Sequence, residues 1–440
     1  MNYEKIPLIN RLYKKIKSLE ASIAILDSEL SGVAEENINM RLKLKKLNHE
    51  KIKVVFVCWR PAVWGSLKTV YEAMKKDNDF DVQIVTIPNK KQLPKLGFHH
   101  EIYESEGAEE FWKGEDVVSG YNYETGEWLD LRLLKADYIC FQQPYNICRT
   151  GAEKSHIVSK YAKLFYVAYF TFFNCNESNF INYECTPPDF MKDLSFYFTQ
   201  NNDDQVFMQN RMREIGNLRA QVVKTGFPRF DNLHVNYDIN TTAWNIKSSH
   251  EYFRLIWTPR WCTDENNCHF FDYKDKLLQY CSTNEKIDFV FRPHPQAFLN
   301  WASTGELSEI EAKKYRERYE KSNNMCIDTS SDFLPTFYTA DCLITDTSSV
   351  VPEFFLTGKP VIYCYKKGSK NSFARNKGYT NGFYWVESWS ELKDILDMLR
   401  SGTDPLFDKR QQLIKRDFYL PNEGAGYLIK EAIKQDFNNA

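Results

Sequence analysis

The sequence lacks the patterns that would assign a chemistry at once. Its 11 Cys include no CxxC pair, and no Cys and His residues have zinc-finger spacing. Its 18 Gly form neither GxGxxG nor GxxxxGK[ST], and no DxD lies at the carboxyl end of an expected strand. These absences argue against a disulfide scaffold, a dinucleotide dehydrogenase, a P-loop NTPase and a metal-dependent glycosyltransferase. We expect no metal and no cofactor.

An excess of charge and long apolar runs are also missing. The 57 Lys and Arg against 59 Asp and Glu leave a net charge of -2, so no global field attracts nucleic acid. The longest apolar run, Leu164 to Phe173, is too short to span a membrane and predicts a buried strand. Near the N-terminus, Glu4, Lys5 and Lys14 interrupt any signal-peptide core. We expect a cytoplasmic chain that does not bind nucleic acid.

Aromatic residues are abundant, with 31 Phe, 26 Tyr and 10 Trp, which excludes a disordered chain. At 440 residues the chain exceeds what one hydrophobic core usually organises. From Lys51 on, nearly all-apolar strands alternate with helical patterns, which is typical of parallel sheets covered on both faces. The fold class is therefore α/β, with two Rossmann-like domains and a cleft between the carboxyl ends of their sheets. We predict residues 1–50 as an oligomerisation segment, 51–236 and 237–412 as the two domains, and 413–440 as a C-terminal helix that can pack back on the first domain.

The first 50 residues carry a heptad repeat. Ile at position a with Leu at position d favours a parallel coiled-coil dimer. The alternative is an amphipathic helix packed on its own domain, which Gly32 in the middle slightly favours. The repeat consists of Ile9, Leu12, Ile16, Leu19, Ile23, Leu26, Leu30 and Val33, followed by Met40, Leu44 and Leu47.

Polar residues support the same pairing. Asn37 falls at an a position, where a buried amide can pair with its mate and set the register. Lys15 with Glu20, and Glu36 with Arg41, are complementary charges at g and the following e position. We predict a homo-oligomer formed through this helix.

The segment ADCLITDTSSVVPEFF places polar residues after an expected strand. Asp346 ends the strand, and Ser348 and Ser349 follow it. With Ser349 as the N-cap and Pro352 in the first turn, free amides at the helix start would suit a phosphate. Glu353 could accept hydrogen bonds from a ribose. The alternative is an ordinary capped helix.

Two more strand ends carry cations. DFVFRPHP supplies Arg292, which can grip a phosphate, and His294, whose backbone is held between two prolines. LIWTPRW supplies Thr258 and Arg260, the latter either a second cation for a diphosphate or a surface residue. Because carboxyl ends of parallel strands share one edge, we expect one anion site there.

Several segments together resemble a known family, the CDP-glycerol glycerophosphotransferases of teichoic-acid and capsule biosynthesis. The resemblance covers about Lys51 to Lys434 and is most specific in the second half. The segments, in order, are CWRPAVWGSLKTVYEAMKK, TGFPRFDNL, LIWTPRW, FRPHP, LITDTSSVVPEFF, GKPVIYC and NEGAGYLIKEAI.

The resemblance implies a GT-B architecture in which the second domain holds a CDP-activated alditol and the first a glycan or lipid-linked acceptor. It also implies transfer of a phosphoalditol with release of CMP. Residues of the family motifs match His294, Asp346, Ser348, Ser349 and Arg260, and Glu423 and Gly424 fall in its short glycine motif. With the residues at the strand ends, this predicts catalytic roles for His294 and Asp346, donor phosphate binding by Thr258, Arg260, Arg292, Ser348 and Ser349, and nucleotide or alditol binding by Glu353, Glu423 and Gly424.

One family segment is absent. The better-known polymerases have HGTP in the acceptor domain, with a proposed base, and this chain has CFQQPYN and FYVAYF instead. An acceptor pocket could be shaped by Trp64, Gln142, Gln143, Tyr145 and Tyr169, and the alternative for these residues is core packing.

The sequence therefore predicts a peripheral transferase that moves glycerol phosphate from CDP-glycerol, or a related CDP-alditol, to a hydroxyl of a surface-glycan precursor. Lysines in the first 50 residues could attract it to an anionic inner membrane face. Two alternatives are a GT-B nucleotide-sugar glycosyltransferase and a non-catalytic assembly subunit.

Overall fold

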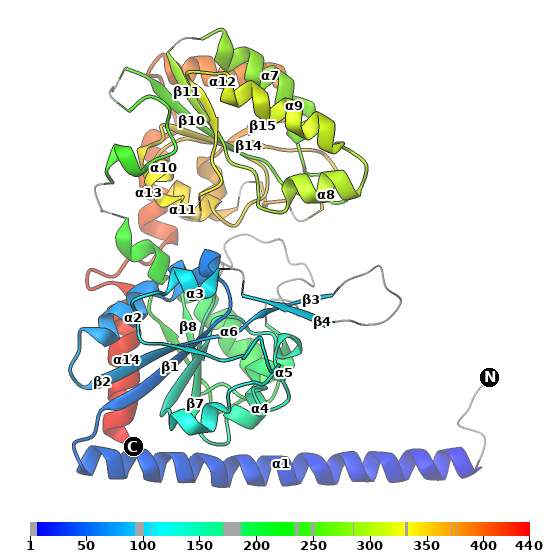
Figure 1. Cartoon of the computed structure of the whole chain (residues 1–440), viewed down its shortest axis with the longest axis vertical. Helices are drawn as coiled ribbons and strands as arrows, with labels where there is room; N and C mark the ends of the chain where they lie inside the picture. The colour runs from blue at the N-terminus through cyan, green and yellow to red at the C-terminus, as the bar shows by residue number, and fades with distance from the viewer. Residues whose placement is uncertain are drawn as a thin grey trace.

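Two parallel sheets form the framework of the computed structural model (Figure 1). The first has seven strands in the order β5-β2-β1-β6-β7-β8-β9, and the second has six in the order β12-β11-β10-β13-β14-β15. The structure describes residues 7–92, 101–105, 107–169, 186–233, 237–247, 251–284, 286–330, 333–370, 372–375 and 377–440.

The central strands of the first sheet arise from short apolar runs with both faces buried. Alternate residues of β1 point to opposite faces, so Phe56 joins one core and Val57 the other. Within the apolar run Leu164 to Phe173 the strand ends at Val167, and residues 170–173 lie outside the described residues. The strands are β1 (Ile52–Cys58), β2 (Phe80–Thr86), β5 (Val117–Ser119), β6 (Tyr138–Phe141), β7 (Lys163–Val167), β8 (Phe196–Thr199) and β9 (Gln221–Lys224).

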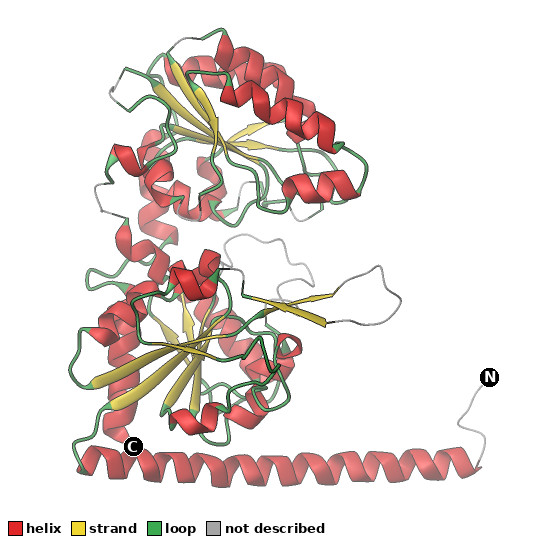
Figure 2. Ribbon diagram, in the orientation of Figure 1, coloured by secondary structure: helices red, strands yellow, loops and turns green. Residues whose placement is uncertain are grey.

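Helices cover both faces of this sheet (Figure 2). One core, with Ile38, Val70 and Ile433, lies under α1, α2 and α14, and the other, with Phe190 and Met208, lies under α4 to α6. The helices are α1 (Pro7–Leu47), α2 (Lys68–Lys75), α4 (Ser155–Val158), α5 (Pro188–Met191), α6 (Asn202–Glu214) and α14 (Ala425–Asn439); smaller elements are β3 (Asn89–Gln92), β4 (Glu101–Glu104), α3 (Ala108–Phe111) and the 3-10 helices η2 (Pro61–Ser66) and η6 (Pro228–Asn232).

The second sheet is covered in the same way. Five of its strands lie within one residue of the runs that the sequence predicts because these runs are almost wholly apolar, whereas the strand at Tyr384–Val386 is not predicted. The predicted runs are Phe253–Trp257, Asp288–Phe291, Met325–Ile327, Cys342–Thr345 and Pro360–Tyr363. They are β10 (Phe253–Thr258), β11 (Ile287–Phe291), β12 (Met325–Ile327), β13 (Cys342–Thr345), β14 (Val361–Cys364) and β15 (Tyr384–Val386), with helices α7 (Phe270–Ser282), α8 (Ala297–Ser303), α9 (Glu309–Glu320), α10 (Leu334–Thr339), α11 (Val351–Phe355), α12 (Trp389–Arg400) and α13 (Phe407–Asp417).

The order of the strands reverses direction in each sheet. The reversal lies between β1 and β6 in the first sheet and between β10 and β13 in the second. Open α/β sheets bind ligands outside the carboxyl ends of the strands at such a point. The loops that follow these four strands are therefore the first place to look for a site.

The last helix returns to the first domain. After α13 of the second domain, the chain crosses back and α14 packs against α2 (Figure 1). Lys430 and Lys434 of α14 bind Asp77 at 3.0 Å, and Asp436 accepts a 2.6 Å hydrogen bond from Tyr138. No described helix is long and apolar enough to cross a bilayer.

Candidate functional site

Asp346 organises the reversal point of the second sheet. It directly follows β13 and is fully buried. One carboxylate oxygen accepts the backbone N–H groups of Arg260 and His269, each at 3.0 Å, and the other lies 2.7 Å from Nδ1 of His269. Asp346 thus ties the loop after β10 to the start of α7, and it is not presented to a substrate.

His269 was not predicted from the sequence. It caps the start of α7, and its ring is buried and stacks on Tyr273 with centroids 5.4 Å apart. Burial opposes its charge, but the carboxylate of Asp346 raises the pKa of His269 above the usual value. Because Nδ1 faces Asp346, Nε2 remains for another partner.

The two predicted arginines are held by carboxylates. Arg260 places Nε and Nη2 on Glu265 at 2.8 and 2.7 Å. Arg292 bonds Asp328 at 2.7 Å and the carbonyl of Ser330 at 2.8 Å. Each guanidinium therefore has a defined orientation but part of its positive charge is compensated within the protein.

His294 is exposed, with its ring stacked on Trp261 at 5.5 Å between centroids. The backbone N–H of Gln296 donates to His294 Nδ1 at 3.2 Å. Loss of water around the ring, together with the positive charges of Arg260 and Arg60, lowers the pKa of His294 to about 4. Solvent at the exposed edge screens part of this repulsion, but the direction makes His294 neutral at pH 7.

Arg60 of the first domain also contributes to the surroundings of His294. It follows β1 and stacks on Trp59 at 4.5 Å, and its charge reaches His294 of the other domain. Gln142 after β6 holds this loop: its carbonyl accepts from the N–H groups of Trp59 and Arg60 at 2.9 and 3.0 Å. Arg60 was missed, although its position directly after a strand was a usable signal.

The expected helix start at Ser349 is wrong. The helix begins at Val351 with Val350 as its N-cap, because Ser348 first accepts the Val351 N–H in a turn. Ser349 is exposed and Ser348 half-buried, and α11 has only five residues. The free backbone N–H groups that we expected at a helix start at Ser349 are therefore not arranged there.

Two other donor-site residues have partners inside the protein. The buried Thr258 hydroxyl lies 2.9 Å from that of Thr345. Glu353 is 2% exposed and pairs with Arg229 at 3.1 Å, and Arg229 also donates to the carbonyl of Ala62 at 3.3 Å. Glu353 thus links the domains in this structure and is not presented to a ribose.

The predicted acceptor residues differ in their surroundings. Trp64 is buried against Phe56 and Trp112, and Gln142 is fully buried against backbone. Both side chains are thus part of the packed interior. The half-buried Tyr145 and Tyr169 share a hydrogen bond of 2.9 Å between their hydroxyls, and Gln143 is buried with no hydrogen-bond partner for its side-chain amide.

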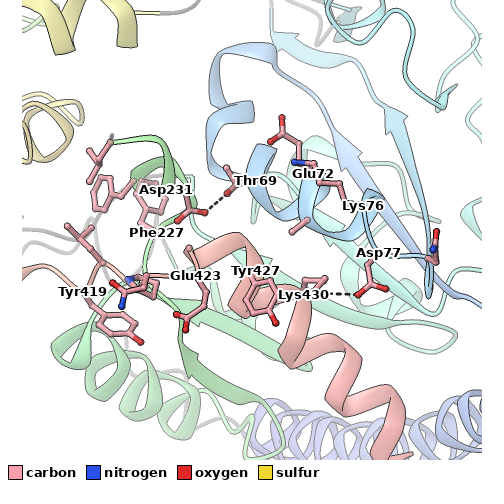
Figure 3. Close-up of a pocket in the computed structure, with 18 residues that line it drawn as sticks. Thr69, Glu72, Lys76, Asp77, Phe227, Asp231, Tyr419, Glu423, Tyr427 and Lys430 are labelled. Carbon is pink, nitrogen blue, oxygen red and sulfur yellow. Dashed lines mark hydrogen bonds and ion pairs between the residues drawn. The ribbon is translucent and has the colours of Figure 1, made fainter. Parts of the chain in front are cut away.

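Glu423 and Gly424 line a different cavity, of about 830 Å³, between α2, η6 and the start of α14 (Figure 3). Asp231 accepts the N–H groups of Ala425 and Gly426 at 2.6 and 2.9 Å and the hydroxyl of Thr69 at 2.6 Å. These bonds cap α14. None of the other predicted donor residues lines this cavity.

Metal ligands do not gather in the described part of the chain: no three His, Cys, Asp or Glu residues there could hold an ion together. The cationic side chains at the site include those of Arg60, Arg260 and Arg292.

The structural comparisons establish the fold. The wall teichoic acid polymerase TagF has 15% identity and a TM-score of 0.55 over 98% of each chain. A putative UDP-N-acetylglucosamine 2-epimerase from Listeria monocytogenes has 15% identity and a TM-score of 0.55, over 89% of this chain and 98% of that one. The S. aureus MnaA-UDP structure has 12% identity and a TM-score of 0.56, over 88% and 97%. The predicted GT-B-like pair of parallel-sheet domains is confirmed.

The sequence comparisons match one family and no curated protein. No curated protein matches the chain. Residues 191–380, which contain Arg260, His269, His294 and Asp346, match the family described as CDP-glycerol:poly(glycerophosphate) glycerophosphotransferase. The family resemblance predicted from the motifs is therefore confirmed over residues 191–380.

Proposed function

We propose that the protein transfers glycerol phosphate from CDP-glycerol to a hydroxyl of a surface-glycan precursor and releases CMP. The observation that carries this proposal is the family match over the residues that form the His294, Arg260 and Asp346 edge of the second sheet. The likeness to TagF supports the fold such a reaction uses; one matching TagF structure was soaked with CDPG.

The acceptor hydroxyl oxygen attacks the phosphorus that carries glycerol. A new P–O bond forms there, the P–O bond to the CMP phosphate breaks, and CMP leaves with the bonding electrons. The hydroxyl proton passes to solvent. Such a transfer depends mainly on alignment and charge stabilisation.

His294 donates a hydrogen bond to a phosphate oxygen. Gln296 occupies Nδ1 as a donor, so the neutral ring carries its proton on Nε2. A neutral ring in this tautomer cannot accept the acceptor's proton at Nε2. His294 could either donate to the leaving phosphate or deprotonate the attacking hydroxyl, and the hydrogen bond from Gln296 favours the donor role.

Arg260 and Arg292 stabilise the diphosphate, and Arg60 joins them from the first domain. Glu265 and Asp328 hold two of these guanidiniums in place, which lowers the entropy cost of binding. Asp346 is a positioning residue: it fixes the Arg260 loop and orients His269. Tyr145 and Tyr169 are the remaining candidates for the acceptor side.

Calorimetric titration with CDP-glycerol, CDP-ribitol, CMP and UDP-sugars tests the donor. We expect cytidine-selective binding that weakens at least tenfold in Arg292→Ala, while Arg375→Ala, which removes an exposed arginine, binds normally. Preference for a UDP-sugar would instead support the glycosyltransferase alternative. CDP-glycerol binding without CMP release on any acceptor would support an assembly subunit.

A further inference from the structure

The heptad residues of α1 lie on the outside of the molecule. Those with described side chains are more than half exposed, although all are apolar. Contact of apolar side chains with water is unfavourable in free energy, so a continuous exposed apolar stripe indicates an interaction surface. The residues are Leu12, Ile16, Leu19, Ile23, Leu26, Leu30, Val33, Met40, Leu44 and Leu47.

A different face of α1 holds the helix on its own domain. Ala34, Ile38 and Leu42 are buried there, Arg41 donates to the carbonyl of Ala136 at 2.9 Å, and Lys45 pairs with Asp137. At 100° per residue this face lies about 120° around the helix from the heptad stripe. The packing alternative and the self-association prediction thus concern different faces. Arg41 is engaged within its own chain, so the expected Glu36–Arg41 pair is not available in this arrangement.

We propose that the heptad stripe forms a parallel, two-stranded coiled coil with α1 of a second copy of this chain. Figure 1 shows the N-terminal half of α1 extending beyond the first domain, where a partner helix has access. At 1.5 Å per residue, its 41 residues provide a seam roughly 60 Å long.

The charges and the residue spacing of the heptad stripe indicate that a second α1 helix covers it, and not a membrane. The apolar residues repeat every three and four residues, which makes the narrow seam of a coiled coil, and acidic residues such as Glu20 and Glu29 flank it. A helix that lies on an anionic membrane has a wider apolar face flanked by basic residues. Across a parallel seam, Lys15 of each copy faces Glu20 of the other.

Asn37 determines whether the two helices run parallel or antiparallel. In a parallel pair in register, the two Asn37 side chains meet at the same layer and can bond each other. In an antiparallel pair, each Asn37 amide would be buried among Leu or Ile side chains without a partner. A parallel pair also places both catalytic domains at one end of the coil, so that two sites can act on one polymeric acceptor.

Analytical ultracentrifugation of the full chain at micromolar concentration tests the proposal. We expect a dimer, a monomer for the double variant Leu19→Glu/Ile23→Glu, and a dimer for Ser18→Glu/Ser28→Glu, which adds the same charge on other faces of α1. Under mild oxidation, Leu26→Cys should cross-link to the same position of its partner, which reports parallel register.

Two outcomes would overturn the proposal. One is a wild-type chain that remains monomeric. The other is a monomer that sediments with phosphatidylglycerol vesicles and loses this binding in Leu19→Glu/Ile23→Glu, which would assign the stripe to a membrane. The dimer measurement does not depend on the proposed enzymatic function.

Discussion

At the residue scale, the site depends on a few polar side chains whose partners set their protonation. His294 is neutral because its surroundings are cationic and partly dry, whereas His269 is drawn toward its charged form by Asp346. The two imidazoles thus have opposite pKa shifts at one sheet edge. Environment, and not residue type, separates their roles.

His294→Ala should lower kcat by roughly 100- to 1000-fold, because a donor aimed at developing phosphate charge is lost. His294→Gln should retain more activity than His294→Ala, because the Gln amide can still donate. The lowered pKa predicts no inflection from His294 in kcat/KM between pH 5.5 and 8. Measurement of CMP release across this range checks both points. If the two variants lost the same activity, and if the unmodified protein showed an inflection that both variants lacked, His294 would act as a base.

Glu153 should make stability depend on pH. It is 1% exposed, both carboxylate oxygens lack a hydrogen-bond partner, and burial raises its pKa to about 8. Between pH 4.5, the ordinary pKa of a Glu side chain, and pH 8, the carboxyl of Glu153 therefore keeps its proton in the folded state and loses it in the unfolded state. The free energy of unfolding should fall as pH rises from about 5 to 8, by up to about 1.4 kcal/mol per pH unit.

Glu153→Gln removes this proton exchange and should flatten the dependence. Calorimetric unfolding at pH 5.5 and 7.5 measures it, with Glu110→Gln, at an exposed surface pair, as the matched control. The same pH dependence in both variants would contradict the assignment.

At the element scale, the docking of α14 on α2 depends on close backbone contact. A Cβ at Gly426 would lie 2.5 Å from the carbonyl carbon of Thr69, so only glycine allows this approach. Asp231 caps the same end of α14, and Lys430 binds Asp77 on the other side of the cavity (Figure 3). The C-terminal helix is thereby part of the first domain's structure.

Gly426→Ala should destabilise the protein by about 1–3 kcal/mol, because α14 must move away from α2. Gly32→Ala, in a helical position with nothing within 4 Å, should instead stabilise α1 by roughly 0.5–1 kcal/mol. Thermal unfolding compares the two. A stability for Gly426→Ala equal to that of the unmodified protein would mean that the contact is loose.

At the scale of the whole molecule, one buried ion pair connects the two domains. Arg229 in η6 binds Glu353 of α11 and the backbone of η2. Burial raises the pKa of Glu353, and Arg229 opposes this shift. The pair therefore lies where the domains meet, on elements next to the site loops.

Glu353→Ala should cost about 3–5 kcal/mol, since it leaves the charge of Arg229 without its partner. The double variant Arg229→Met/Glu353→Leu should cost less than the sum of its own single variants, Arg229→Met and Glu353→Leu, which complete the cycle with the unmodified protein. Chemical unfolding of the four proteins gives the coupling energy. Additive costs would show that the pair does not connect the domains energetically.

Much of this organisation can be predicted from the sequence. Strands such as Cys342–Thr345 were located because a parallel sheet buried on both faces requires continuous apolar runs. Arg260, Arg292 and His294 were located because they directly follow such strands. The Ser349 cap was wrong because local preference for serine at a helix start did not account for the preceding turn.

Sequence alone determined the alternation of strands and helices, the heptad seam of α1 and the family segments, because apolar periodicity and local motifs are properties of neighbouring residues. Tertiary structure alone decided that Asp346 holds His269, 77 residues away, that the charge of Arg60 in the first domain lowers the pKa of His294 in the second, and that Glu353 pairs with Arg229. It also decided which face of α1 is covered. Contacts between distant segments depend on how the elements pack, and no local pattern records them.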